Sequence, residues 1–110
     1  MQSNNIRKIK ETNVDRIAMG IIANAGDSRS LSFEALQAAR EGNFEEAKMK
    51  LKESSEKLIK AHEFQTQLMI REAEGEEVKS SVLISHAQDH LMIAILARDL
   101  IEEMIALYER

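Results

Sequence analysis

The stretch that decides the fold is SVLISHAQDHLMIAILARDLIEEMIALYER, which runs from Ser81 to Arg110. From Val82 to Ala97 most positions are apolar, and the polar ones gather in the first half. The stretch has no Pro and no Gly and is dense in good helix formers, so it predicts one long helix. A helix that is apolar nearly all round is buried nearly all round, so we expect this helix to face other protein on most sides.

The polar residues in this apolar helix need an explanation, because charged side chains are rarely buried without a partner. His86, Asp89 and His90 stand at i, i+3 and i+4, so they share one helical face. The His pair could bind a transition metal, the polar groups could satisfy one another at a subunit interface, or a His could act as a nucleophile. Spacing alone favours the interface. A zinc hydrolase is disfavoured, because Ala87 stands where the helical zinc motif has its general-base Glu.

Upstream, residues 1–12 are mostly polar and are predicted to form a flexible N-terminal arm, with the beginning of the first helix as the alternative. From Val14 onward, apolar residues follow the spacing of an amphipathic helix, with Asn13 as a plausible N-cap. Gly26-Asp27-Ser28 interrupts this pattern, so it either ends one helix and caps the next or bends a continuous helix. The segment stops at Gly42, a residue type common just after a helix end.

The next helix is predicted to open at Asn43, with Glu46 in a capping-box arrangement. Apolar or small residues then recur at nearly heptad spacing, and charged residues fill the opposite face. This seam consists of Phe44, Ala47, Leu51, Ser54, Leu58, Ala61, Gln65 and Leu68. Gly75 in an acidic turn ends the helix, and Ser80 or Ser81 is predicted to cap the C-terminal one.

Three helices with short connections predict an all-α protein, an antiparallel three-helix bundle in which residues 13–110 form a single domain. A bundle of this size buries one stripe of each helix, and the C-terminal helix has more apolar surface than that. We therefore expect a homo-oligomer, in which this helix faces its own core on one side and its symmetry mates on the other.

Composition narrows the function classes. The chain of 110 residues has a net charge of −4, no basic stripe and no aromatic platform, which argues against nucleic-acid binding. It has no cysteine, so no disulfide framework or thiol chemistry is expected. No apolar run is long enough to span a bilayer and the N-terminus lacks a signal-peptide core, so we expect a cytoplasmic protein.

Three strings, HAQDHLM, AGDSRS and AAREGNFEEA, resemble the lactose/cellobiose (N,N′-diacetylchitobiose) enzyme IIA family of the bacterial phosphoenolpyruvate-dependent sugar phosphotransferase system. The likeness covers about residues 10–110, and HAQDHLM is its most specific part. It implies a three-helix protomer in a parallel homotrimer, a nine-helix assembly. It also implies a phosphocarrier. His86 would accept a phosphoryl group from the phosphohistidine of HPr and pass it to a cysteine of the cognate enzyme IIB, for uptake of a disaccharide through a membrane permease.

The same resemblance implies that Asp89 lies near the trimer axis, where three copies would bind one divalent metal, with Mg²⁺ suited to such oxygen ligands. Gln88 and His90 are candidates to hydrogen-bond the phosphoryl oxygens or to orient His86, and either could instead face another subunit. His62 is interpreted as a surface or partly buried residue. The alternative to a phosphocarrier is a metal-binding structural or regulatory helical trimer without phosphoryl transfer.

Overall fold

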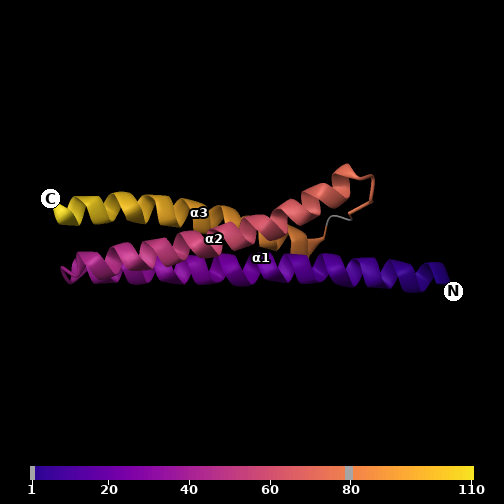
Figure 1. Ribbon diagram of the computed structural model, residues 1–110, viewed down its shortest axis with the longest axis horizontal. Helices are drawn as coiled ribbons and strands as arrows, with labels where there is room; N and C mark the ends of the chain where they lie inside the picture. Colours follow the sequence, from indigo (N-terminus) through magenta and orange to yellow (C-terminus); the bar gives the residue numbers. More distant parts are fainter. Residues whose placement is uncertain (1, 79–80) are drawn as a thin grey trace.

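The chain folds into three helices that run along one long axis (Figure 1). This computed structural model describes the backbone of residues 2–78 and 81–110 and the side chains of residues 13–78 and 81–110. The helices are α1 (Gln2–Arg40), α2 (Phe44–Ala73) and α3 (Val82–Glu109). The described backbone contains no strand, so the predicted all-α, antiparallel three-helix architecture is confirmed.

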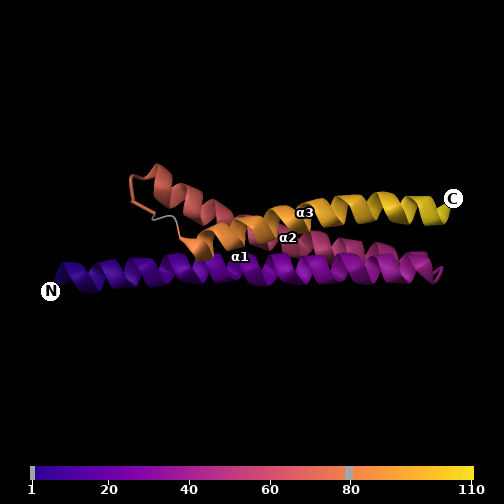
Figure 2. The same cartoon turned by 180° about the vertical axis from the view of Figure 1, so that it is seen from behind.

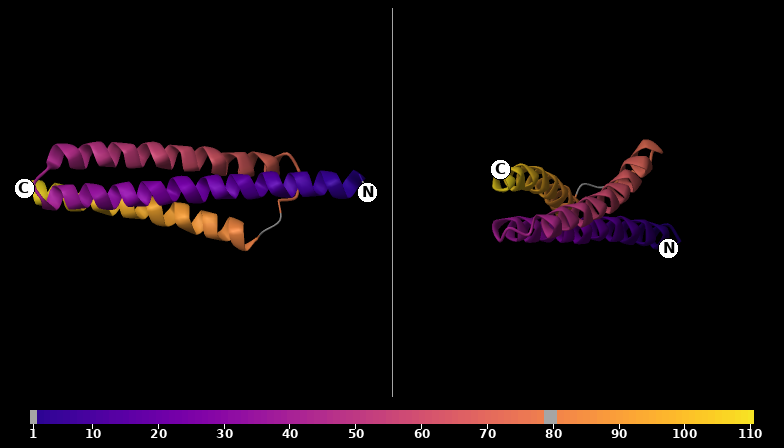
Figure 3. Two further views of the ribbon diagram at one scale, coloured as in Figure 1. Left: turned by 90° about the horizontal axis from the view of Figure 1, so that it is seen from below. Right: turned by 60° about the vertical axis from the view of Figure 1, so that its left-hand side comes forward.

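The molecule is a rod of 64 × 19 × 19 Å, and α1 runs along most of its length. Both other helices pack mainly on α1 and contact each other less. Seen from behind, the last turns of α2 swing away from α1, whereas α3 begins beside α1 (Figure 2). The right-hand view of Figure 3 shows the same splaying of α2, whereas in its left-hand view α2 runs alongside α1. None of the described helices is long and apolar enough to cross a membrane.

The start of α1 differs from what the sequence suggests, and its middle follows one of the two options that the sequence left open. The helix begins at Gln2, so the prediction of Asn13 as its N-cap is wrong. The flexibility of residues 1–12 stays a prediction. The helix also continues through Gly26-Asp27-Ser28, which supports the continuous-helix option over an end and restart. Ser28 is fully buried against α2, and such tertiary contacts outweigh the weak helix propensity of this triplet.

Glycines end α1 and α2 as predicted. Gly42 has φ 84° and Gly75 has φ 88°, a left-handed conformation in which other residues are strained. After α1, the Asn43 N–H donates to the Ala38 carbonyl over 2.8 Å, and the Gly42 N–H donates to the Ala39 carbonyl over 3.0 Å. This pair of bonds is the Schellman motif, which satisfies carbonyls that the helix end leaves free.

The predicted helix starts are confirmed in part. Asn43 is the N-cap residue of α2, but its side chain makes no capping hydrogen bond. The capping box with Glu46 would use the Asn43 N–H, which is already bonded to Ala38 at the end of α1. Ser81 caps α3, where its hydroxyl accepts a 3.1 Å hydrogen bond from the Ile84 N–H. The other candidate, Ser80, lies outside the described residues.

The interior consists of two apolar clusters rich in alanine, which lets the helix backbones approach one another closely. The first cluster contains Ile17, Ala18, Ile21, Ala25, Leu58, Ala61, Leu68, Ala87, Leu91 and Ala94. The second contains Ala35, Ala38, Ala39, Ala47, Leu51, Ile101 and Ile105. The α2 members of both clusters belong to the predicted seam, which is therefore confirmed, with Phe44 and Gln65 only half-buried.

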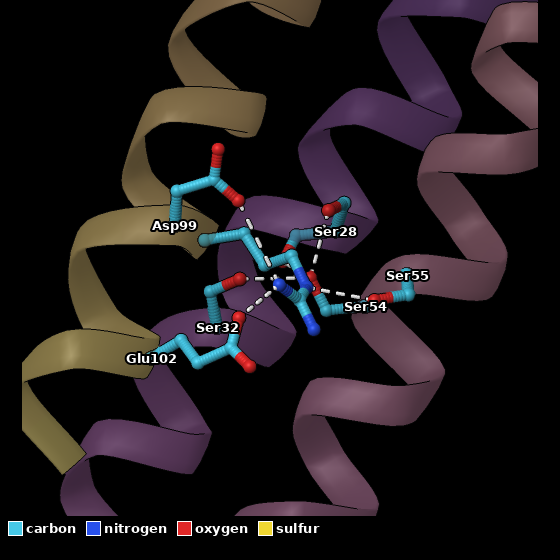
Figure 4. A network of polar contacts seen from close by, with 7 residues as sticks. Ser28, Ser32, Ser54, Ser55, Asp99 and Glu102 are labelled. Carbon is cyan, nitrogen blue, oxygen red and sulfur yellow. Dashed lines mark hydrogen bonds and ion pairs between the residues drawn. The ribbon is translucent and has the colours of Figure 1, made fainter. Parts of the chain in front are cut away.

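Three fully buried serines lie between the two clusters (Figure 4). The Ser54 hydroxyl of α2 donates to the Ser28 carbonyl of α1 over 2.9 Å. The Ser28 and Ser32 hydroxyls lie 2.8 and 2.7 Å from the Ser54 hydroxyl oxygen. Beside them, Arg98 of α3 donates to the Ser55 hydroxyl over 2.7 Å, so a polar layer joins all three helices.

Candidate functional site

The polar cluster of α3 faces an open pocket beside α1. Helical periodicity places His86, Asp89 and His90 on one face of α3. Together with Ile93 and with Arg29 from α1, they line a pocket of about 390 Å³. The structure therefore brings together three of the four residues that the sequence singles out, and it adds an arginine from another helix.

The two histidines of the pocket have different surroundings. The ring centroids of His86 and His90 lie 5.1 Å apart in an edge-on arrangement, with an interplanar angle of 77°. His90 is half-buried, and its Cε1 atom would lie 4.0 Å from a Cβ atom placed at Gly26. His86 is exposed. His90 thus packs between α1 and His86, and the His86 imidazole is the one open to an incoming group.

Gln88 lies away from this pocket. Its side-chain oxygen accepts a 2.6 Å hydrogen bond from the Gln65 amide of α2. The Gln65 oxygen in turn lies 3.1 Å from His62 Nδ1. His62 is exposed on α2, as the sequence suggests. These contacts join α2 to α3, and a role of Gln88 toward a group bound at His86 stays a prediction.

Arg29 is the pocket residue that sequence reasoning missed. It belongs to the AGDSRS string in the middle of α1, far from HAQDHLM in the sequence. Its guanidinium carbon lies 5.5 Å from the centre of the Phe33 ring, a cation–π contact one turn further along α1. The spacing of residues along α3 cannot indicate which residue of α1 lies beside them. The sequence pointed to Arg29 only through the AGDSRS string, which resembles the enzyme IIA family.

Asp89 begins an exposed apolar stripe along α3. The side chain is exposed and has no ion-pair partner among the described residues. Positions at helical spacing after it are exposed and apolar, which is unusual over such a length in an isolated chain. This outer stripe consists of Ile93, Leu96, Leu100, Met104 and Leu107. No group of three or more metal-ligating His, Cys, Asp or Glu side chains occurs within the described part of one chain.

The chain matches a known protein family over most of its length. Residues 16–109 match the family described as "PTS system, Lactose/Cellobiose specific IIA subunit". The Lichenan-specific phosphotransferase enzyme IIA component of Bacillus subtilis (strain 168) is 44% identical over 97 residues, which make up 88% of this chain and 88% of that protein.

Solved structures agree with this match. The crystal structure of the PTS cellobiose-specific enzyme IIA from Bacillus anthracis superposes with a TM-score of 0.85 at 44% identity, covering 87% of this chain and 88% of that one. A solution structure of the IIA(Chitobiose)–HPr complex of the N,N′-diacetylchitobiose branch of the Escherichia coli phosphotransferase system gives a TM-score of 0.76 at 43% identity. It covers 87% of this chain and 93% of that one.

Proposed function

The chain belongs to the lactose/cellobiose-specific IIA subunits of the phosphotransferase system, which are phosphotransferase phosphocarriers, and we propose that His86 carries its phosphoryl group. The observation that carries this proposal is the exposure of the His86 imidazole at an open pocket, while His90 is half-buried against α1. A phosphocarrier has to present the same side chain to two partners in turn, so its nucleophile must be accessible. His86 meets this requirement better than either other histidine of the described chain, because His90 is half-buried against α1 and His62 lies outside the pocket.

The proposed step is an in-line transfer between two imidazoles. A lone pair on a ring nitrogen of neutral His86 forms the new P–N bond as the P–N bond of the donor phosphohistidine breaks. The donor ring, which carries a proton on its other nitrogen, leaves as neutral imidazole. The proton on the second nitrogen of His86 stays in place, so the transfer needs no external base. His90, edge-on to His86 at 5.1 Å, restricts the orientation of the attacking ring.

The proposed partners are HPr and a cognate enzyme IIB. The donor in this proposal is the phosphohistidine of HPr, and a solved relative is a complex of IIA(Chitobiose) with HPr. The acceptor is a cysteine of a cognate enzyme IIB, and the chain, which has no cysteine, would leave that thiol chemistry to its partner. We place the protein in the cytoplasm, where it would serve a membrane permease that takes up a disaccharide of the lactose, cellobiose or chitobiose type. Gln88 would act indirectly, by fixing α3 against α2 through Gln65.

We further propose that the protein is a homotrimer built on the outer stripe of α3. That stripe is exposed and apolar in one chain, and its position on a single face lets three copies pack α3 against one another around a threefold axis. Asp89 lies on the same face, so three carboxylates would meet near the axis. In this arrangement the exposed apolar side chains of α3 would be buried between the subunits.

We propose that a magnesium ion binds only to the trimer and not to a single chain. One exposed Asp89 carboxylate does not satisfy Mg²⁺, and the described residues of one chain hold no set of three ligands. Three Asp89 carboxylates around an axis would provide hard oxygen ligands and leave octahedral positions for water. The ion would then neutralise three mutually repelling charges and hold the subunits together. The transfer proposed for His86 does not depend on it.

The first prediction tests the carrier residue. The purified protein is incubated with phosphoenolpyruvate, enzyme I and HPr at neutral pH, and its intact mass is measured. We expect a gain of about 80 Da, the mass of one phosphoryl group, that is acid-labile and depends on HPr. His86→Ala should abolish this gain, because the nucleophile is gone, and should keep the helical circular-dichroism signal, because the side chain is exposed.

His62→Ala is the matched control, since it removes an exposed histidine of α2 outside the pocket and should leave the mass gain intact. Labelling that survives in His86→Ala would show that the carrier is a different residue. An unlabelled wild-type protein, with HPr shown to be phosphorylated in the same reaction, would refute the phosphocarrier proposal and favour a structural or regulatory trimer.

A further inference from the structure

We infer that Arg29 binds the phosphoryl group while it is on, or moving to, His86. This inference rests on the proposed phosphocarrier function and assigns a residue from α1 to a site otherwise built from α3. Arg29 lines the same pocket as His86, His90 and Asp89, and its guanidinium forms no ion pair within 4 Å among the described residues. An arginine that lines the same pocket as a phosphate-accepting nucleophile is chemically matched to the equatorial oxygens of the transferring group.

The charges in the pocket support this assignment. The pocket is lined by two imidazoles, the apolar Ile93, the Asp89 carboxylate and the Arg29 guanidinium. A phosphoryl group on His86 carries close to two negative charges, and Asp89 would repel it. Arg29 is the one permanently charged cation among the lining residues. Without Arg29, the side chains that line the pocket would oppose this negative charge with imidazoles alone.

Before any ligand binds, the Arg29 guanidinium carbon lies 5.5 Å from the Phe33 ring centre on the next turn of α1. This contact is weak, so the long side chain can leave the ring and turn toward a phosphoryl group in the pocket. The planar fork can face one oxygen pair of a phosphoryl group without first giving up a salt bridge, since no ion pair to Arg29 occurs among the described residues. Transfer by positioning and charge neutralisation needs such a donor.

The test compares Arg29→Gln and Arg29→Lys with the wild-type protein in rapid-quench transfer from phospho-HPr. Loss of one charged hydrogen-bond donor at a phosphoryl group typically slows transfer by about tenfold to a hundredfold, and we expect Arg29→Gln to fall in this range. Arg29→Lys keeps the charge and loses the fork, so its rate should lie between the two. A second readout is the ³¹P NMR shift of the phosphohistidine, which should move in Arg29→Gln if the guanidinium contacts the phosphoryl oxygens.

Arg16→Gln is the control, because it removes the same charge from an exposed position of α1 outside the pocket. It should transfer at close to the wild-type rate. If the wild type accepts phosphate and Arg29→Gln transfers within twofold of it with an unchanged ³¹P shift, Arg29 has no part in the site and the phosphocarrier function stands. An equal loss in Arg16→Gln would also overturn the inference, since the effect would then be general electrostatics. If the wild-type protein accepts no phosphoryl group from phospho-HPr, the proposed phosphocarrier function itself is refuted.

Discussion

Gly20 and Gly26 both lie inside α1, but an added methyl group would meet different neighbours at the two positions. A Cβ atom at Gly20 would come within 2.8 Å of the Phe64 ring of α2, which is closer than real contacts allow. At Gly26 the nearest atom would be His90 Cε1, at an ordinary 4.0 Å. The absence of a side chain at Gly20 thus leaves room for Phe64 to pack against the first apolar cluster. At Gly26 a methyl group would fit beside His90 without displacing it.

Alanine substitutions at Gly20 and Gly26 test this difference as a matched pair. Alanine raises helix stability over glycine by about 1 kcal/mol, so Gly26→Ala should be neutral or more stable. Gly20→Ala gains the same helix term but must displace a half-buried ring, at a cost of about 1–3 kcal/mol. We therefore expect Gly20→Ala to unfold at lower urea concentration than Gly26→Ala, measured at one protein concentration. Equal midpoints would show that Phe64 moves aside freely.

At the scale of helices, the buried serine layer holds α1 and α2 in one register. Ser54 is its hub, because it contacts both Ser28 and Ser32 hydroxyls and donates to the Ser28 carbonyl. A slip of α2 along α1 would set these hydroxyls against the alanines and leucines of the neighbouring clusters. Three buried hydroxyls that are satisfied in only one alignment penalise every other alignment.

The prediction for this layer is non-additivity. Ser54→Ala removes the hub and leaves two buried hydroxyls short of a partner, so it should destabilise the fold by about 1–3 kcal/mol. The triple change of Ser28, Ser32 and Ser54 to Ala removes every member at once and leaves none unsatisfied. We expect the triple variant to be more stable than Ser54→Ala alone, measured by urea unfolding. Three additive losses would show that each hydroxyl contributes independently and that the layer is not a unit.

The sequence predicts those features of the elements that have a local cause. Gly42, Gly75 and Ser81 mark helix ends because their backbone or side-chain chemistry acts on neighbouring residues. The spacing of His86, Asp89 and His90 predicts a common face for the same reason. Two other features depend on contacts with α2, namely the continuity of α1 at Gly26 and the buried position of Ser28. Neighbouring residues in the sequence do not indicate such contacts, so the sequence did not predict them. Arg29 was missed likewise, because it reaches the site from another helix.

At the scale of the whole molecule, the exposed outer stripe of α3 is the feature that a single rod does not explain. Leu96 and Leu100 are 59% and 55% exposed, and Leu107 is 64% exposed, all on the face that begins with Asp89. Burying such a continuous stripe is a strong driving force for association. In the proposed trimer the stripe would be interior, and the splayed end of α2 would lie outside.

Leu100→Glu tests this assembly. The position is 55% exposed in one chain, so a carboxylate costs the isolated protomer little, whereas three carboxylates near a threefold axis would be desolvated and would repel one another. We expect sedimentation velocity to show a trimer for the wild type and a monomer for Leu100→Glu. Ile59→Glu, at a 57% exposed position of α2, should stay trimeric. A trimer that survives Leu100→Glu would place the interface elsewhere.

The monomer produced by this change also separates assembly from chemistry. In the single chain, the pocket around His86 is lined by Arg29 of α1 and by residues of α3. If that pocket is sufficient for transfer, monomeric Leu100→Glu should still accept phosphate from HPr, at a rate within about tenfold of the wild type, the size of one lost contact. A monomer that folds with full helicity yet accepts no phosphate would mean that a neighbouring subunit completes the site.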